Sequence, residues 1–124
     1  MSAVKGKNFW APAAWRFIHS IAVTYTPDKA EQFKVMMTTF TDLLPCEICQ
    51  VNLKEKLKKF PIDQYLKSNE TLFFWTYVLH DLVNQAINST NPKVKKVSPP
   101  YDQVKSFYFN SLNVSCTDCN AAPK

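Results

Sequence analysis

The chain has 124 residues, eight prolines, four cysteines and a single glycine. That length suits one small domain. One glycine excludes the glycine-rich phosphate loops of dinucleotide-binding and P-loop proteins, and also the repeated hairpin turns of a small all-β fold. The net charge of +5 would suit an anionic partner, but no base-reading motif accompanies it, so we favour solubility over nucleic-acid binding.

The chain begins with a polar segment, Met1 to Asn8, which lacks the apolar core of a signal peptide. No later stretch approaches 18 consecutive apolar residues, the length that would indicate a membrane-spanning helix. We therefore expect neither secretion by the usual route nor a membrane span.

Apolar residues recur at helical spacing through residues 13–25, and Pro27 closes this first predicted helix. A second apolar stripe runs through residues 33–44 and ends at Pro45. The third predicted helix covers residues 46–60, with its lysines mainly off the apolar side, and Pro61 ends it. These prolines are good stop signals because proline cannot continue a helix.

The longest predicted helix runs from Leu72 to about Asn88, and its apolar residues go most of the way round. Such a helix is expected to be the central, most buried element. A polar segment follows, and Pro99-Pro100 precedes a short helix over about residues 101–112. We therefore predict an all-α fold, a four-helix bundle with a short fifth helix, as a single domain over residues 1–112 with a flexible tail over residues 113–124.

The first cysteine pair, Cys46-Glu47-Ile48-Cys49, comes directly after Pro45 at a predicted helix start. Free N–H groups and the positive end of the helix dipole stabilise a thiolate there, which makes Cys46 the better nucleophile. Cys49 lies one turn further on and can close a disulfide with it. This pair is predicted to carry out dithiol–disulfide exchange.

The second pair, Cys116 and Cys119, lies close to the C-terminus with no predicted helix behind it. A disulfide here closes only a tiny loop and adds little stability, so a structural role is a poor explanation. We interpret the pair as a redox shuttle that carries a dithiol or disulfide between a client and the first pair.

Other interpretations of the four cysteines remain open. Two Cys-x-x-Cys pairs can bind one zinc ion in a helical adaptor, but zinc ribbons separate the pairs by roughly 15 to 20 residues, and here the interval is several times longer. A thioredoxin-like fold needs a strand before the first pair, where this sequence predicts a helix. Plain buried thiols would explain one pair more easily than two.

Aromatic and polar residues also recur at helical spacing outside the cysteine pairs. Trp15 and His19 are four residues apart, Tyr25 follows within two turns, and His80 and Asn84 are again four apart. Such residues can line a slot for a flat ring system, with stacking from the aromatic rings and hydrogen bonds from His and Asn. Taken alone, they are more often core residues.

Taken with the cysteines, these residues form an ordered pattern. It consists of Trp15 to His19, Tyr25, Cys46 to Cys49, and Trp75 to Asn84. This order resembles the Erv/ALR family of FAD-dependent sulfhydryl oxidases, whose pattern is W-x-x-x-H, a Tyr, C-x-x-C and then W-x-x-x-x-H-N-x-V-N. The resemblance covers roughly residues 12–91 and continues more weakly to Tyr108. Four blocks in order are far more specific than one Cys-x-x-Cys motif.

The resemblance implies a helical bundle, usually a homodimer, with FAD between helices and the active-site disulfide against its isoalloxazine ring. Cys49 would be the thiol next to the flavin, and Cys46 the thiol that exchanges with incoming dithiols. Lys96 is the preferred phosphate contact over Lys93 and Lys95. The implied FAD contacts are Trp15, His19, Tyr25, Cys49, His80, Val83, Asn84, Ile87, Lys96 and Tyr108.

In the implied reaction, two protein thiols become a disulfide and oxygen becomes hydrogen peroxide. Electrons would pass from a client dithiol to Cys116 and Cys119 on the partner subunit, then to Cys46 and Cys49, then through FAD to oxygen. The implied partners are protein dithiols, such as a small thioredoxin-like carrier, and a second copy of the chain, with no nucleic acid.

The sequence departs from the family pattern in several places. Asp81 stands where the family usually has Asn, the segment after Asn84 is longer, and Tyr108 replaces a common Trp. The extra disulfide of many cellular members has no counterpart. This reduced plan looks most like the compact versions of large DNA viruses. A viral source would place the protein in the cytoplasm of the infected cell or the virion, and a cellular source in the mitochondrial intermembrane space.

Overall fold

The structure is a computed structural model that describes residues 6–91, 93, 95–117 and 119. Within this part of the chain every regular element is a helix, which confirms the predicted all-α class. No described helix is both long enough and apolar enough to cross a membrane. The elements are α1 (Lys7–Val23), a 3₁₀ turn (Pro27–Lys29), α2 (Ala30–Asp42), α3 (Glu47–Lys59), a second 3₁₀ turn (Asp63–Tyr65), α4 (Asn69–Thr90) and α5 (Tyr101–Ser111).

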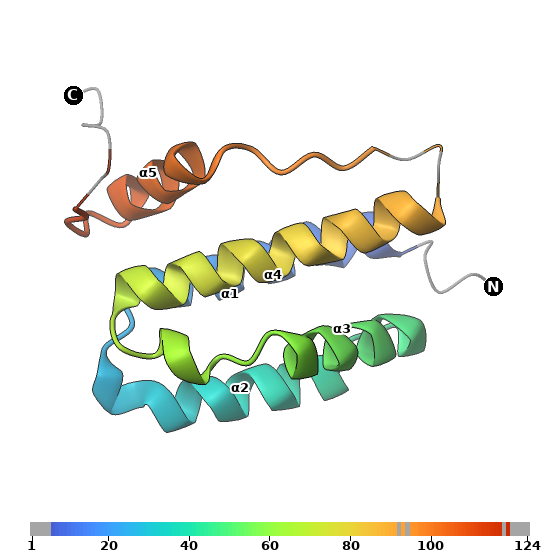
Figure 1. Cartoon of the computed structure of the whole chain (residues 1–124), viewed down its shortest axis with the longest axis horizontal. Coiled ribbons are helices and arrows are strands. Elements are labelled where there is room, and N and C mark those ends of the chain that lie inside the picture. Colours follow the sequence, from blue (N-terminus) through green and yellow to red (C-terminus); the bar gives the residue numbers. More distant parts are fainter. Residues whose placement is uncertain (1–5, 92, 94, 118, 120–124) are drawn as a thin grey trace.

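The helices are arranged around α4, the longest of them (Figure 1). Helix α1 packs along α4, while α2 and α3 pack together on one side of this pair. Helix α5 contacts α1 and α4 at the end where α4 begins. Residues 95–100, which precede α5, run back along α4 on the side away from α2 and α3 (Figure 1).

Two helix starts differ from the sequence prediction. Helix α1 begins at Lys7 and not at Ala13, with Pro12 inside it, and it ends at Val23. Pro12 lies in the second turn, where it removes one backbone hydrogen bond, and the packing of α1 against α4 compensates for this loss. Helix α4 begins at Asn69, where Ser68 and Thr71 form a reciprocal cap: each side-chain oxygen lies 3.1 Å from the other residue's backbone nitrogen.

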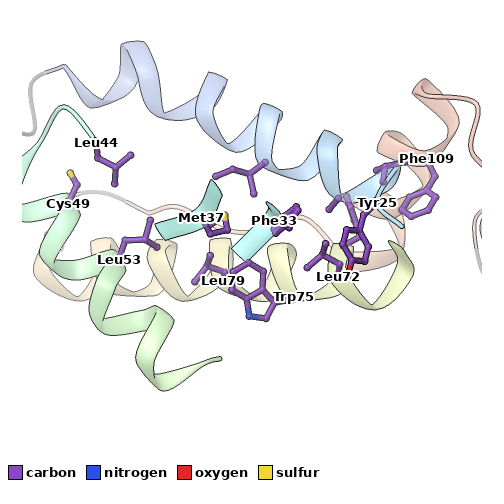
Figure 2. Packing of buried hydrophobic residues seen from close by; sticks show 14 of the residues in the cluster. Tyr25, Phe33, Met37, Leu44, Cys49, Leu53, Leu72, Trp75, Leu79 and Phe109 are labelled. Carbon is purple, nitrogen blue, oxygen red and sulfur yellow. The ribbon is translucent and has the colours of Figure 1, made fainter. Parts of the chain in front are cut away.

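The hydrophobic core confirms the prediction that α4 is the most buried element. Leu72, Phe73, Trp75 and Leu79 are all fully excluded from solvent. The Trp75 indole also donates a hydrogen bond of 3.1 Å to the carbonyl of Phe60, which ties α4 to the end of α3. Figure 2 shows that the core is elongated, with Cys49 at one end and Phe109 at the other.

Candidate functional site

The first cysteine pair forms a disulfide at the start of α3. Cys46 is the N-cap residue, in extended conformation, and its Sγ accepts a hydrogen bond of 3.2 Å from the backbone N–H of Cys49. The Cα atoms of the two cysteines are 5.2 Å apart. Pro45 therefore precedes a helix start as predicted, and the N-cap position puts Cys46 where free N–H groups and the helix dipole favour a thiolate.

The surroundings of this disulfide combine burial with an exposed neighbour. Cys46 and Cys49 are 5% and 8% exposed, whereas Ile48 between them is 57% exposed. The Leu44 carbonyl accepts hydrogen bonds from the backbone N–H of Cys46, at 2.8 Å, and from the Gln50 side chain, also at 2.8 Å. These bonds fix the turn before α3, and with it the position of Cys46, so the buried disulfide lies next to an exposed Ile48.

A cavity of about 380 Å³ lies between α1, α4, α5 and the segment before α5. Its size is in the range of small-molecule sites, and its lining combines aromatic rings with uncharged hydrogen-bonding groups. The lining residues are His19, Tyr77, His80, Asn84, Ser98, Pro99, Gln103, Val104, Phe107 and Tyr108.

One wall of the cavity is the chain segment 95–99, which we call the strap. The Asn88 side chain holds the first half of the strap through two hydrogen bonds to Lys96. It donates to the Lys96 carbonyl at 2.8 Å and accepts from the Lys96 backbone N–H at 2.7 Å. Further along, Ser98 donates to Asp81 at 2.7 Å and accepts from Asn84 at 3.1 Å. Asp81, which departs from the family pattern, therefore holds the cavity wall in place.

Two histidines from different helices meet at the cavity. His19 of α1 is 3% exposed, and its Nε2 lies 3.1 Å from Nδ1 of His80 on α4. The other ring nitrogen of His19 lies 2.9 Å from Oγ1 of Thr76, which is fully buried. Trp15 covers one face of His80, with ring centroids 4.1 Å apart and planes 5° from parallel.

Both histidines are neutral at physiological pH. Burial first, and then the charges of His80 and Arg16, lower the pKa of His19 to about 3. Burial and then Lys96 lower the pKa of His80 to about 4, against the opposing effect of Asp81. Two uncharged imidazoles give the cavity directional hydrogen bonding without adding positive charge.

Lys56 and Lys96 both lie close enough to Lys7 to repel its charge. Burial first, and then repulsion from Lys96 and Lys56, lower the pKa of Lys7, and Lys96 also acts on His80. Side chains from α1, α3 and the strap thus bring positive charge to one region. Such a region is suited to the negative charge of phosphate groups.

The second cysteine pair also forms a disulfide, with Cα atoms 5.5 Å apart. Its loop is fastened to the start of α4 through Glu70, whose carboxylate accepts from the Thr117 hydroxyl at 2.7 Å and from the Thr117 backbone N–H at 3.4 Å. The same carboxylate accepts from the ammonium of Lys105, 5% exposed, at 2.6 Å. We call Glu70, Lys105 and Thr117 the Glu70 clamp. The hydrogen bond from Lys105 first, and then those from Thr117, keep the pKa of Glu70 below its usual value.

The two disulfides lie at opposite ends of the molecule. Figure 1 places the start of α3 at one end of the long axis and the segment after α5 at the other. Figure 2 shows the same separation between Cys49 and Phe109. As described, the second pair of a chain is therefore remote from the first pair of that chain.

The structure brings several of the expected FAD contacts together. His19, His80, Asn84 and Tyr108 all line the cavity, and Trp15 stacks on His80. Val83 and Ile87 are half-buried on α4 outside the lining, and the Lys96 backbone is held at the strap.

Two of the expected contacts lie elsewhere. Tyr25 is buried in the core, where its ring meets Phe33 edge-on and its hydroxyl donates to the Leu66 carbonyl at 2.8 Å. Cys49 lies at the start of α3 and is not among the lining residues. The roles of all ten residues in cofactor binding stay predictions.

Sequence reasoning missed several residues of the site. Thr76, Tyr77 and Ser98 were not considered as contacts, although Thr76 lies four residues before His80 and therefore on the same face of α4. Tyr77 donates to the carbonyl of Pro99 and fastens the strap. The spacing from His80 would have found Thr76, whereas the strap contacts have no signal in the local sequence.

The cavity and its surroundings fit the chemistry of a dinucleotide. The rings of Trp15 and Tyr108 offer faces for a flat base, His80 and Asn84 offer hydrogen bonds, and the lysines offer counter-charge for phosphates. At about 380 Å³ the cavity suits one half of such a molecule, and the rest would extend outside it.

The zinc interpretation finds no support in the described part of the chain. Both cysteine pairs are closed as disulfides, so their thiols are not available as ligands. No group of three or more His, Cys, Asp or Glu side chains among the described residues is placed to hold a metal ion.

The model of the Erv1 / Alr family matches residues 12–102 of the chain. A protein of Acanthamoeba polyphaga mimivirus named probable FAD-linked sulfhydryl oxidase R368 is 35% identical over 80 residues, which cover 60% of this chain and 56% of that protein. The chain therefore spans little more than half the length of that relative.

Other relatives are matched over different shares of their length. The FAD-linked sulfhydryl oxidase of African swine fever virus, isolate Tick/Malawi/Lil 20-1/1983, is 30% identical over 107 residues, 83% of this chain and 82% of that protein. The FAD-linked sulfhydryl oxidase ERV1 of Arabidopsis thaliana is 29% identical over 79 residues, 60% of this chain and 40% of that protein. No solved structure gives a match.

Proposed function

Because the chain belongs to the Erv1/Alr family, we propose that it is an FAD-linked sulfhydryl oxidase of the compact viral type, which makes disulfides in protein substrates. The observation that carries the proposal is the Cys46–Cys49 disulfide at the first turn of α3, in a helical bundle that also holds a cavity suited to a dinucleotide. The relatives from mimivirus and African swine fever virus are named FAD-linked sulfhydryl oxidases.

FAD, when bound, accepts two electrons and two protons from a dithiol and passes them to oxygen, which becomes hydrogen peroxide. The residues that would hold its adenosine half are chiefly His80 and Asn84, which line the cavity, and Trp15, which stacks on His80. Lys96 would contribute charge to the phosphates. The aromatic rings would exclude water from the base, and the neutral histidines would orient it.

Cys46 and Cys49 would carry out the exchange. A substrate thiolate attacks the Cys46 sulfur and forms a mixed disulfide, while Cys49 leaves as a thiolate close to the helix start, where the dipole stabilises it. A second substrate thiolate then attacks the substrate sulfur of the mixed disulfide, so the bond to Cys46 breaks, Cys46 leaves as a thiolate and the substrate is released as a disulfide. The enzyme pair is left as a dithiol, which gives up two electrons and two protons in its reoxidation.

Cys116 and Cys119 would act as the shuttle between clients and the first pair. The position of the second pair at the far end of the chain supports transfer to a partner subunit, because its own first pair is remote (Figure 1). This arrangement would require a homodimer. The domain would then be residues 1–112, with the segment 113–124 as the shuttle arm; residues 118 and 120–124 lie outside the described residues.

The test is the absorbance spectrum of the purified protein, followed by oxygen consumption with dithiothreitol. We expect flavin absorbance that is bleached by dithiothreitol without oxygen, and peroxide formed in proportion to thiol consumed. Cys49→Ser should abolish turnover and retain bound flavin. The matched control is Ser115→Ala, an exposed position beside the second pair, which should turn over like the wild type.

A correctly folded preparation that binds no FAD would overturn the proposal. So would a Cys49→Ser protein that oxidises dithiothreitol at the wild-type rate. Size measurement by light scattering tests the dimer separately, and a monomer that oxidises protein clients through Cys116 would exclude transfer between subunits.

A further inference from the structure

Thr76 is a fully buried polar residue of α4 that contacts no cavity surface itself. Its hydroxyl oxygen lies 2.7 Å from the backbone carbonyl oxygen of Phe73 and 2.9 Å from Nδ1 of His19. His19 in turn touches His80, which lines the cavity. Thr76 is therefore the inner end of a hydrogen-bonded chain that ends at the candidate binding site.

The hydrogen bond between Thr76 and Phe73 determines which atoms donate and which accept along this series of hydrogen bonds. A carbonyl oxygen has no proton, so the hydrogen of the Thr76 hydroxyl must lie between Thr76 and Phe73. The Thr76 oxygen is then an acceptor toward His19, and Nδ1 of His19 carries the proton. The reverse arrangement would leave two oxygens 2.7 Å apart with no hydrogen between them, an unpaired contact in a site without water access.

The same argument passes from His19 to His80. A neutral imidazole carries one proton, so Nε2 of His19 is bare and accepts, and Nδ1 of His80 must donate across the 3.1 Å contact. The second nitrogen of His80, Nε2, is then also bare. Among the described residues no hydrogen bond to this atom is recorded. Burial keeps both rings neutral, as their pKa values of about 3 and about 4 indicate.

We propose that Thr76 is a positioning residue that fixes His19 and His80 in their Nδ1–H tautomers, so that His80 meets the cofactor with a hydrogen-bond acceptor. The group that it receives is therefore a donor, either the exocyclic amine of adenine or a hydroxyl of the adenosine ribose. This inference rests on the proposed function for the identity of the ligand. The tautomers themselves are set by the protein and do not require the ligand.

The first test is nitrogen NMR of the histidine rings in the purified flavoprotein and after removal of FAD. Long-range proton–nitrogen correlations distinguish a bare ring nitrogen from a protonated one. Both histidines of the wild type should be protonated at Nδ1 near pH 7, with or without FAD. A proton at Nε2 of either ring would overturn the proposal even in a protein that binds no FAD, whereas absence of FAD binding alone would overturn only the proposed function.

The second test compares two substitutions of the same residue. Thr76→Val keeps the shape and removes the hydroxyl, so His19 loses its acceptor and both rings become free to take the other tautomer. Thr76→Ser keeps the hydroxyl and is the conservative control. We expect the Val variant to show Nε2–H signal and to bind FAD about tenfold more weakly, by fluorescence titration, and the Ser variant to restore both.

A Val variant that folds, with both rings still at Nδ1–H, would overturn the proposal, and so would a Ser variant no better than Val. If Val does not fold, the wild-type spectrum and the Ser variant still decide it. Three FAD analogues identify the donor: one with hypoxanthine in place of adenine lacks the amine, and those with 2′-deoxyribose or 3′-deoxyribose each lack one hydroxyl. Selective weakening of one of them supports the acceptor at His80, and unchanged binding of all three overturns it.

Discussion

The buried histidine pair makes folding stability depend on pH in a range where few other groups titrate. His19 and His80 have ordinary pKa values of 6.5 when unfolded and about 3 and about 4 when folded. Below pH 6.5 the unfolded chain therefore takes up protons that the folded chain does not. Stability is fully present above pH 6.5 and falls as the pH drops from there toward the folded pKa values.

The size of the effect follows from the span of pH. Between pH 6.5 and pH 5.0, each histidine that stays neutral in the fold lowers the free energy of unfolding by about 2 kcal/mol, at roughly 1.4 kcal/mol per pH unit. His19 should contribute nearly all of this and His80, which is only half-buried, somewhat less. The pair should lower the free energy of unfolding by about 3 kcal/mol, or about 12 °C in melting temperature for a domain of this size.

The assay is urea unfolding followed by circular dichroism at pH 7.5 and pH 5.0, at fixed ionic strength and the same FAD concentration. The control is His80→Phe, which keeps a ring for Trp15 to stack on and removes one titrating group. Its loss of stability should be about two thirds of that of the wild type, because the contribution of His19 remains. A wild-type loss below about 1 kcal/mol, or an equal loss in the Phe variant, would refute the reasoning.

Three further changes test other parts of the site. Cys116→Ser should slow oxidation of a reduced protein client at least tenfold and leave dithiothreitol oxidation unchanged, with Ser115→Ala as control; equal slowing of both substrates contradicts a shuttle role. Glu70→Gln removes the counter-charge of buried Lys105 and should cost about 2 kcal/mol in urea unfolding, and a change below about 0.5 kcal/mol would contradict the Glu70 clamp. Lys96→Ala should raise the Kd for FAD about fivefold, from the loss of about 1 kcal/mol with phosphate, and an unchanged Kd at low salt would count against it.

Much of the fold was predictable because it depends on local signals. The apolar stripes repeat at helical spacing, and prolines at positions 27, 45 and 61 separate the helices that the structure contains. The start of α3 is the clearest example, since Pro45 and the cysteine that caps the helix are adjacent in sequence. The order of the motif blocks then indicated the family that the comparison confirms.

The start of α1 was not predictable from the same signals. The apolar spacing predicted a helix from residue 13, yet the helix begins at Lys7 with Pro12 inside it, because packing of the first helix against α4 compensates for one missing hydrogen bond. Tertiary packing thus overrides a local stop signal when the proline falls early in a helix.

The site was predictable only as a set of residues and not as a network. Trp15, His19, His80 and Asn84 were found by their spacing, but the 3.1 Å contact between the two rings depends on how α1 and α4 are aligned. Thr76 was overlooked, although its spacing of four residues from His80 places both on the same face of α4. The strap was missed because its bonds join residues that no sequence periodicity relates.

The strap also bears on how a molecule bound in the cavity would enter and leave. It is held to α4 by side-chain hydrogen bonds of Tyr77, Asp81, Asn84 and Asn88, and its mostly exposed residues contribute little to the apolar core. Opening the cavity therefore requires breaking these few bonds, while the packing around Trp75 stays intact. If FAD occupies this cavity, as we propose, its exchange is governed by a local opening equilibrium and not by the rate at which the bundle unfolds.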